Sequence, residues 1–418
     1  MRIAIVGAGI VGTTAAYELA ADGHEVIVFE RRGSVASEAS FAHGGVVSSA
    51  SEAFWGQERH AGTLLRCLLG GHAALRLRGL GAIGHLPWLW RCMRSGHPAT
   101  RESTRLSVLR LARFSQSRLL ELTRTLALDY EQRSGLMLLL RGERELIQAR
   151  AGLKLLAEVG IGFELLDADR ARLREPGLNP DTPLRAAIYL PHEGVGNCRL
   201  FAQLLKTEAQ RRGADFRFEQ TVQRVVPGTR PAVVVNGHEQ TFDAVVLCSG
   251  VESNALLRPL KLLLPLAPVY GYSLTAPLRH LDGQPEPGPR AALIDEKYKV
   301  TLSRLGQRIR ISGGIELGGG PTSLNPTALR TLYRVFDDWF PGAAQTRQTQ
   351  AWKGARPTLP DGAPVVGASG AAGIWLSVGH GASGWALSCG SARVLADQIG
   401  GRSPLLDLAG LAIDRMRQ

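Results

Sequence analysis

Residues 1–30 have the sequence MRIAIVGAGIVGTTAAYELAADGHEVIVFE, and the rest of the chain is arranged around this stretch. Its apolar residues predict a short buried strand over Arg2–Val6 and a second strand over His24–Phe29. An alanine-rich helix is predicted between them, over Thr13–Ala21. The order strand, glycine turn, helix, strand is typical of a nucleotide-binding α/β unit.

Three glycines stand at the turn between the first strand and the helix. Gly7 permits the tight turn, Gly9 lets the backbone approach a pyrophosphate, and Gly12 lets the helix pack closely on the strand. Glu30 follows the second strand, where a carboxylate can accept hydrogen bonds from both ribose hydroxyls. The stretch therefore predicts binding of a dinucleotide, and the acid at Glu30 argues against a 2′-phosphate and hence against NADP.

The composition indicates an ordinary globular protein. The chain has 418 residues, enough for two domains, with 44% hydrophobic and 21% charged residues. The cysteines show no metal-binding spacing, so we expect them to be reduced and no metal to be bound: they are Cys67, Cys92, Cys198, Cys248 and Cys389. Because the first strand begins at residue 2 and no long apolar run follows, we expect neither a signal peptide nor a membrane span, and a cytoplasmic location.

The positive charge is concentrated in one segment. The formal net charge is +12, and residues 54–118 hold eleven arginines against two acids. Leu64–Leu69 and Leu86–Arg91 mix arginine with leucine, and the second adds tryptophan. Such a mixture suits an anionic membrane surface, and equally a segment packed on the protein's own core with arginines reaching to water. Nucleic acid is disfavoured, because no common binding-module signature is present.

The remaining chain alternates between helical and extended patterns. Helices are predicted at Arg101–Thr125, Glu143–Val159, Cys198–Arg212, Thr327–Phe340 and Trp385–Ile399. Strands are predicted at Tyr130–Leu140, Ala187–Leu190, Phe216–Val226, Ala232–Val235, Ala244–Cys248, Val269–Thr275, Ala292–Ile294, Tyr298–Ser303, Ile309–Gly313, Gln350–Arg356, Val365–Gly367 and Ile374–Val378. From residue 262 onwards β signals dominate, which indicates a second domain with an antiparallel sheet.

Near its end the chain repeats the order of elements predicted at its start: a strand, a glycine-rich loop and a helix. The strand Ile374–Val378 leads into the glycine-rich loop Gly379–Gly384 and then into the helix that begins at Trp385. The positive N-terminus of this helix could meet a second part of the same ligand. The small residues 39–45 predict a loop that lies close to a ligand, and Ser249-Gly250 predicts a turn beneath it.

These motifs together resemble one family, the small-subunit FAD-dependent D-amino-acid dehydrogenases of bacteria, within the wider D-amino-acid oxidase and glycine/sarcosine oxidase superfamily. Besides the opening stretch, the tracts that carry the resemblance are Ser40–Gly45, GYSLT (271–275), EKYK (296–299), WKGARPTLPDGAPVVG (352–367), Gly379–Gly381 and Gly384-Trp385. The similarity extends from end to end. It departs at His43, where many of these dehydrogenases carry Asn and some relatives with D-arginine-like substrates carry His.

The resemblance implies an α/β fold with a Rossmann-like FAD-binding domain that is discontinuous in sequence. We expect this domain to comprise 1–95, 187–253 and 351–418. A substrate-binding α+β domain, built on a mostly antiparallel sheet, would comprise 96–186 and 254–350. FAD would be held without a covalent bond, since Gly354 stands where sarcosine oxidases carry their flavin-linking cysteine.

The expected FAD-binding residues follow from the motifs and the resemblance together. They are Gly7, Ala8, Gly9, Ile10, Val11, Gly12, Glu30, Arg31, Ser40, His43, Gly44, Gly45, Val222, Ser249, Gly250, Arg356, Gly379, His380, Gly381, Ser383, Gly384 and Trp385.

The resemblance also assigns a substrate clamp. Arg356 stands at the position of the family's substrate arginine, and a guanidinium can form two parallel bonds to a carboxylate; its alternative is a structural pair with Asp361. Tyr298 would add a hydroxyl bond to the same carboxylate, unless it is a core residue of the sheet. Tyr270 and Tyr272 are further candidates.

The reaction implied is oxidative deamination of a D-amino acid to a 2-oxo acid and ammonia, by hydride transfer from Cα to flavin N5. His380 and His43 could tune the protonation of the amine, or be structural. Electrons would pass to a quinone or another carrier, with the protein on the inner face of the membrane. Two alternatives stay open: an oxidase that uses oxygen as the electron acceptor, and a flavin-binding subunit that catalyses no turnover. D-alanine suits the small residues near the ring, and His43 allows larger or cyclic substrates such as D-proline.

Overall fold

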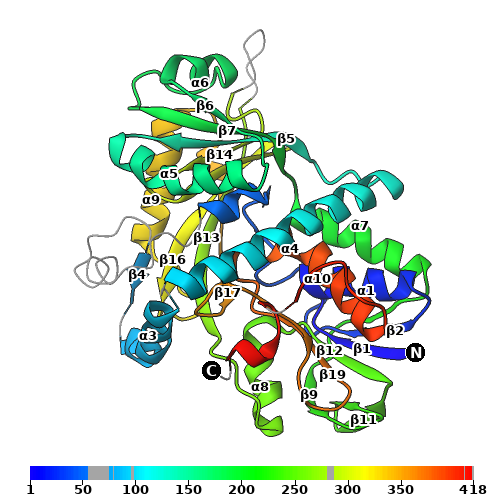
Figure 1. Ribbon diagram of the computed structural model, residues 1–418. Helices are drawn as coiled ribbons and strands as arrows, with labels where there is room; N and C mark the ends of the chain where they lie inside the picture. The colour runs from blue at the N-terminus through cyan, green and yellow to red at the C-terminus, as the bar shows by residue number, and fades with distance from the viewer. Residues whose placement is uncertain (55–74, 79, 96–97, 280–286, 409, 417–418) are drawn as a thin grey trace.

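The computed structural model describes the chain except residues 55–74, 79, 96–97, 280–286, 409 and 417–418 (Figure 1). Its described part contains a six-stranded, a three-stranded and a ten-stranded sheet. In Figure 1 the ten-stranded sheet lies at the upper left with α5 and α9, and the six-stranded sheet lies at the lower right with α1 and α10. The expected α/β class, with a mostly antiparallel sheet beside a nucleotide-binding unit, is confirmed.

The six-stranded sheet is built around the opening stretch. Its order is β18-β19-β12-β1-β2-β8, and all its pairs are parallel except β18 with β19. The strands are β1 Arg2–Val6, β2 Glu25–Phe29, β8 Asp215–Arg217, β12 Ala244–Leu247, β18 Val365–Ala368 and β19 Ile374–Val378. Ile3 and Ile5 pack into one hydrophobic core, and Ala4 and Val6 into another. Burial on both faces explains the unbroken apolar run.

Four helices contribute to the first of these cores: α1 Ile10–Ala21, α4 Pro98–Thr125, α7 Cys198–Arg211 and α10 Gly384–Ile399. Helix α1 begins three residues earlier than predicted, so Gly12 lies inside it. A Cβ at Gly12 would overlap the carbonyl oxygen of Gly7 and touch Cys248. This glycine therefore allows the close contact between helix and strand that the sequence predicts.

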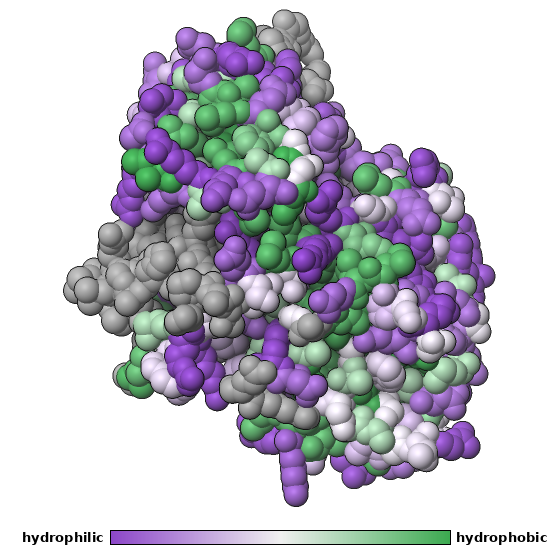
Figure 2. All heavy atoms as spheres, viewed as in Figure 1, coloured by the Kyte–Doolittle hydropathy of each residue, from purple (hydrophilic) through white to green (hydrophobic). Residues whose placement is uncertain are grey.

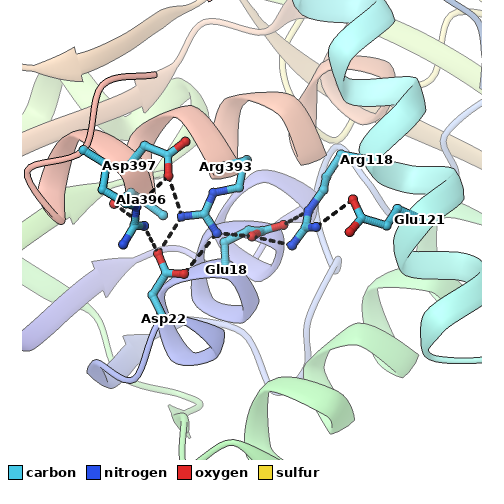
Figure 3. A network of polar contacts seen from close by, with 8 residues as sticks. Glu18, Asp22, Arg118, Glu121, Arg393, Ala396 and Asp397 are labelled. Atoms are coloured by element: carbon cyan, nitrogen blue, oxygen red, sulfur yellow. Dashed lines mark hydrogen bonds and ion pairs between the residues drawn. The ribbon is translucent and has the colours of Figure 1, made fainter. Parts of the chain in front are cut away.

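A charged network joins α1, α4 and α10 (Figure 3). Glu18 of α1 is fully buried and accepts two hydrogen bonds from Arg118 of α4, at 2.7 and 2.9 Å. Arg393 of α10 donates to the same carboxylate at 2.7 Å and pairs with Asp22 and Asp397. Because each cation also has a second acidic partner, the network locks the three helices together.

The ten-stranded sheet has the order β17-β13-β16-β15-β14-β5-β7-β3, with β4 paired to β16 and β6 to β7. Its strands are β3 Val46–Val47, β4 Leu75–Leu77, β5 Arg133–Leu140, β6 Glu164–Leu166, β7 Ala186–Val195, β13 Ala267–Pro277, β14 Ala292–Asp295, β15 Val300–Leu305, β16 Arg308–Leu317 and β17 Gln350–Thr358. Helix α9, Pro326–Trp339, packs on one face, and α5, Glu143–Glu158, contributes to the core on the other.

The remaining elements are short. The small antiparallel sheet consists of β9 Val222–Val226, β10 Ala232–Val235 and β11 His238–Thr241. The other helices are α3 Leu86–Arg94, α6 Ala168–Arg174 and α8 Ser253–Leu257. None of the helices within the described ranges has the length and apolar character needed to cross a bilayer.

Two sequence predictions need correction. The strand predicted over Phe216–Val226 is two strands, β8 and β9, which belong to different sheets. Strand β7 extends to Val195, and it pairs with β5 in the ten-stranded sheet although the expected division placed it in the FAD-binding domain. Strand β17 lies in the same sheet. The division into two domains stays a prediction. Strands β7 and β17 belong to the FAD-binding domain in that division, yet they pair within the ten-stranded sheet and so connect the two parts.

Candidate active site

A cavity of about 520 Å³ is lined by residues of both large sheets, a size typical of ligand-binding sites. One wall comes from the β1–α1 turn and the strand ends of the six-stranded sheet. The opposite wall comes from β13, β15, β16 and β17. The loop over residues 37–44 and the start of α10 lie along it.

Glu30 fixes the turn at one end of the cavity, which we call the nucleotide end. Its carboxylate accepts hydrogen bonds from the N–H of Ala8 at 2.7 Å and of Arg32 at 2.8 Å. Gly7 has φ +100°, and a Cβ there would lie 2.7 Å from the carbonyl oxygen of Cys248. Only glycine suits this backbone, so the turn predicted from the sequence is present.

Two helices begin at the cavity without a side-chain cap. Helix α1 starts after Gly9, which has no side chain, and α10 starts after Ser383, whose hydroxyl does not bond to its own helix. Ser40 Oγ accepts from Ile10 N–H at 3.2 Å, and Ser383 donates instead to the carboxylate of Glu52. Both helix N-termini therefore direct partial positive charge toward the cavity, as a diphosphate or another anionic group requires.

Arg356 of β17 lies at the other end of the cavity, which we call the substrate end. It donates to the Gly314 carbonyl at 3.1 Å, and no carboxylate forms an ion pair with it in the described part of the chain. Burial lowers the pKa of its guanidinium to about 10. The alternative partner, Asp361, is paired with Arg415 at 2.8 Å. Arg356 therefore holds a positive charge against the cavity that a ligand anion can neutralise.

The structure does not bring all the predicted tyrosines to the cavity. Tyr298 packs against the core beneath α9, with Arg334 above its ring at 4.5 Å. Tyr270 does not line the cavity. Tyr272 lines it, but its side chain also packs in the hydrophobic core on the α9 side of the sheet. Lys353 Nζ lies 4.3 Å from the ring of Tyr270 and 5.4 Å from that of Tyr272. These positions favour a core role for Tyr298 and Tyr270.

Both predicted histidines line the cavity, and both are engaged by neighbours. His43 Nδ1 accepts from Gly45 N–H at 3.1 Å, so its Nε2–H donates to the Ala382 carbonyl at 3.3 Å. His380 Nε2 lies 3.0 Å from Ser391 Oγ. Burial lowers the pKa of His43 to about 4 and that of His380 to about 3. Both imidazoles are therefore neutral near pH 7.

Four residues that line the cavity have a buried polar atom without a hydrogen-bond partner in the described part of the chain. These atoms are Trp352 Nε1, Trp385 Nε1, Ser273 Oγ and Ser377 Oγ. Buried polar atoms are nearly always hydrogen-bonded, so a bound ligand is the natural partner. The glycine turn, the acid at Glu30 and the two helix N-termini fit a long dinucleotide, and the unpartnered atoms fit a polar ligand group.

Most of the predicted site residues come together in the cavity. Those that line it are Gly7, Gly9, Ile10, Val11, Glu30, Arg31, Ser40, His43, Gly44, Val222, Ser249, Gly250, Tyr272, Arg356, Gly379, His380, Gly381, Ser383, Gly384 and Trp385. Ala8, Gly12, Gly45, Tyr270 and Tyr298 do not line it. The sequence analysis missed Trp352, Ser273, Ser312 and Thr301. Alternation along β13 could have indicated Ser273, but its neighbours on other strands could not be read from the sequence.

Comparison with known proteins identifies a family and named relatives of this chain. The family model described as FAD dependent oxidoreductase, DAO, matches residues 2–398. A D-amino acid dehydrogenase of Cereibacter sphaeroides is 38% identical, covering 99% of this chain and 95% of the relative. A D-amino acid dehydrogenase of Rhizorhabdus wittichii is 36% identical, covering 99% of this chain and 100% of the relative.

Solved structures share the fold at low identity. Glycine oxidase from Geobacillus kaustophilus superposes with a TM-score of 0.74 at 21% identity, covering 99% of this chain and 98% of that one. L-Proline dehydrogenase from P. horikoshii gives a TM-score of 0.71 at 18% identity, covering 97% and 94%.

Proposed function

Since the chain belongs to the DAO family of FAD-dependent oxidoreductases, we propose that it oxidises small D-amino acids to 2-oxo acids and ammonia. The observation that carries this proposal is Arg356, a partly buried arginine at the cavity with no ion-pair partner among the described residues. A carboxylate is the anion that every amino acid offers to such a group. The relatives named D-amino acid dehydrogenase support the choice of the D series.

The nucleotide end provides the groups that would hold FAD. Glu30 would accept hydrogen bonds from the ribose, and the N-terminus of α1 would face the diphosphate. Gly354 has no side chain to form a covalent link, so we propose that FAD is held by non-covalent contacts. FAD supplies, when bound, the acceptor for the hydride that leaves the substrate Cα, and water then converts the imino acid to the 2-oxo acid and ammonia.

The chain's own residues would position the substrate and tune the charge around it. Arg356 would bind the carboxylate through two parallel hydrogen bonds, which fixes the direction of Cα. The N-terminus of α10 would stabilise negative charge that gathers in the cavity during the reaction. His43 is neutral and bonded on both nitrogens, so we assign it to holding the loop at Gly45 against Ala382.

An anaerobic panel tests this proposal. D- and L-amino acids are added to the FAD-loaded enzyme without oxygen, and loss of flavin absorbance is recorded. We expect bleaching by small D-amino acids, and its loss in Arg356→Ala at matched substrate concentration. Arg347→Ala, which changes an exposed arginine just before β17, is the control. Bleaching that survives in Arg356→Ala, or that only L-amino acids cause, contradicts the proposal.

The same panel, repeated in air and with a ubiquinone analogue, distinguishes the alternatives. Peroxide released during turnover in air would identify an oxidase. No bleaching by any amino acid would favour a flavin-binding subunit without turnover. For a dehydrogenase we expect reduction of a ubiquinone analogue with little peroxide.

We further propose that α3 places this enzyme on an anionic membrane surface, where a dissolved quinone could accept the electrons. Four apolar residues, Ile83, Leu86, Trp90 and Met93, are 37–60% exposed and follow one another at helical spacing. Elsewhere on α3, Leu89 is buried and Trp88 Nε1 donates to the Thr358 carbonyl at 3.2 Å. The helix is thus fixed to β17, two residues from Arg356.

The flanking charge supports this orientation. Arg91 and Arg94 are exposed on α3, and the Arg94 guanidinium lies 4.8 Å from the centre of the Trp90 ring. Figure 2 shows apolar and polar side chains together at the position of α3, at the lower left. Tryptophan with arginine on an exposed helix is typical of an interfacial segment. The predicted Leu64–Leu69 stretch lies outside the described residues.

Vesicle sedimentation tests the membrane contact. The enzyme is mixed at low salt with vesicles of phosphatidylglycerol and phosphatidylcholine, or of phosphatidylcholine alone. We expect binding to the anionic vesicles, weakened several-fold in Trp90→Ser and by added salt. Leu173→Ser is the control, because Leu173 of α6 is 79% exposed and α6 packs beside β6 and β7, far along the ten-stranded sheet from β17 (Figure 1). Equal effects of both substitutions would overturn the assignment to α3.

A further inference from the structure

Three hydroxyl side chains lie next to one another on the cavity face of the ten-stranded sheet: Thr301 of β15, Ser312 of β16 and Ser273 of β13. The register pairs Thr301 with Ser312, and Ser312 with Ser273. Directly opposed residues of antiparallel strands point to the same face. The three side chains therefore form a line across the sheet, the hydroxyl row, which Trp352 of β17 continues opposite Ser273.

Two serines of this row are buried, and two of its polar atoms have no hydrogen-bond partner within the described part of the chain. Ser273 is 2% exposed, and neither its Oγ nor the Nε1 of Trp352 has a hydrogen-bond partner there. Ser312 is 7% exposed. A buried donor or acceptor without a partner is costly, which makes the row a place for a polar ligand group rather than for an apolar one.

The row lies within reach of a carboxylate held by Arg356. The Arg356 guanidinium lies directly over Gly271, since a Cβ at that position would overlap it. Ser273 is two residues further along the same face of β13, roughly 7 Å away by strand geometry. A short amino acid together with one hydrogen bond spans about this distance, from a carboxylate at Arg356 to the Ser273 hydroxyl.

We propose that the hydroxyl row receives the substrate side chain and selects amino acids with a hydroxyl or amide group over apolar ones of equal size. The inference deepens the proposed function and rests on it for the position of the carboxylate. A serine hydroxyl can donate and accept, whereas the indole N–H of Trp352 only donates. A side-chain hydroxyl, or the carbonyl and NH2 of an amide, can satisfy both.

Two carboxylic acids without an amino group test the row apart from the reaction. 3-Hydroxypropanoate and butanoate have the same number of heavy atoms and differ in one hydroxyl. Their dissociation constants are measured by calorimetry on the FAD-loaded enzyme and on its Ser273→Ala variant. We expect the unmodified enzyme to prefer 3-hydroxypropanoate about fivefold to tenfold, as one net hydrogen bond provides. In Ser273→Ala this preference should fall to about twofold or less.

Ser377→Ala is the matched control. Ser377 of β19 is also 2% exposed, lines the cavity and has an unpartnered hydroxyl, but it belongs to the six-stranded sheet. Its substitution should leave the ratio of the two constants unchanged. An unchanged ratio in Ser273→Ala overturns the proposal. Equal weakening of the binding of both acids, together with a shifted flavin spectrum, would also overturn it, because the row would then lie against the cofactor. Failure of both acids to bind the unmodified enzyme would overturn it as well.

Failure of the wider function has a different signature. If no D-amino acid bleaches the flavin while the binding ratio still depends on Ser273, the row is a ligand site and the proposed reaction is wrong. If bleaching occurs and the ratio does not depend on Ser273, the reaction holds and the row is not the selector.

Discussion

The two ends of the cavity are built in different ways. The nucleotide end is mostly backbone: a glycine turn, two helix N-termini, and one acid, Glu30, that bonds the turn itself. The substrate end is mostly side chains, carried by separate strands such as β13, β16 and β17 and aligned by their register. The first end can therefore hold a group common to the whole family, while the second can change its selectivity by single substitutions that leave the backbone in place.

The largest effect should come from adding one carbon at the nucleotide end, in Gly12→Ala. The new Cβ would overlap the Gly7 carbonyl oxygen, which is backbone and cannot move without opening the β1–α1 turn. We expect purified protein with little or no flavin and a free energy of unfolding lowered by about 3 kcal/mol. Flavin content is measured by absorbance and stability by urea unfolding.

Gly162→Ala is the control for this substitution. A Cβ at Gly162 would meet nothing within 4 Å, and its backbone does not have a positive φ. It should keep both flavin and stability. Full flavin content in Gly12→Ala would show that the nucleotide end does not depend on this close contact.

The same contrast explains how much could be predicted from the sequence. The glycine turn and Glu30 lie within one short segment, so local spacing was enough to predict them. Arg356 was found through the resemblance of its tract, not through its surroundings. The hydroxyl row could not be predicted, because Thr301, Ser312 and Ser273 become neighbours only through strand register. Tyr298 was expected at the substrate, but it lies in the turn between β14 and β15 and packs on the α9 face.

A second prediction concerns the network behind the nucleotide end. Glu18→Gln removes the buried charge that Arg118 and Arg393 share. Both arginines keep other acidic partners, so we expect a loss of about 3 kcal/mol in the free energy of unfolding, at the lower end for a broken buried pair. Urea unfolding of the FAD-loaded enzyme measures it.

The exposed partner Glu121 provides the comparison for that variant. Its carboxylate is 55% exposed and lies 2.8 Å from Arg118, so Glu121→Gln should cost less than about 1 kcal/mol. Equal losses in the two variants would mean that the network does not act as a buried clamp between α1, α4 and α10.

At the substrate end, Gly271→Ala should act on the reaction rather than on flavin binding. Its Cβ would overlap the Arg356 guanidinium, a flexible group that can be displaced while β13 and β17 stay paired. We expect kcat/KM for every D-amino acid substrate to fall about thirtyfold, as for a misplaced charged hydrogen bond, with normal flavin content. Retained kcat/KM would mean that Arg356 does not hold the carboxylate in this position.

The smallest effect is a pH dependence that should be almost absent across the neutral range. Burial places the pKa of His43 at about 4 and that of Arg356 at about 10, so neither group changes charge between pH 5 and pH 9. Butanoate is almost fully ionised above about pH 6, so it should bind with a constant affinity from there to about pH 9. Above pH 10 the guanidinium loses its proton and with it the attraction for the carboxylate, so the dissociation constant should rise by up to about tenfold per pH unit. Calorimetry in buffers of constant ionic strength measures this profile. A break between pH 6 and pH 7 would show that a histidine, and not Arg356 alone, controls binding at the substrate end.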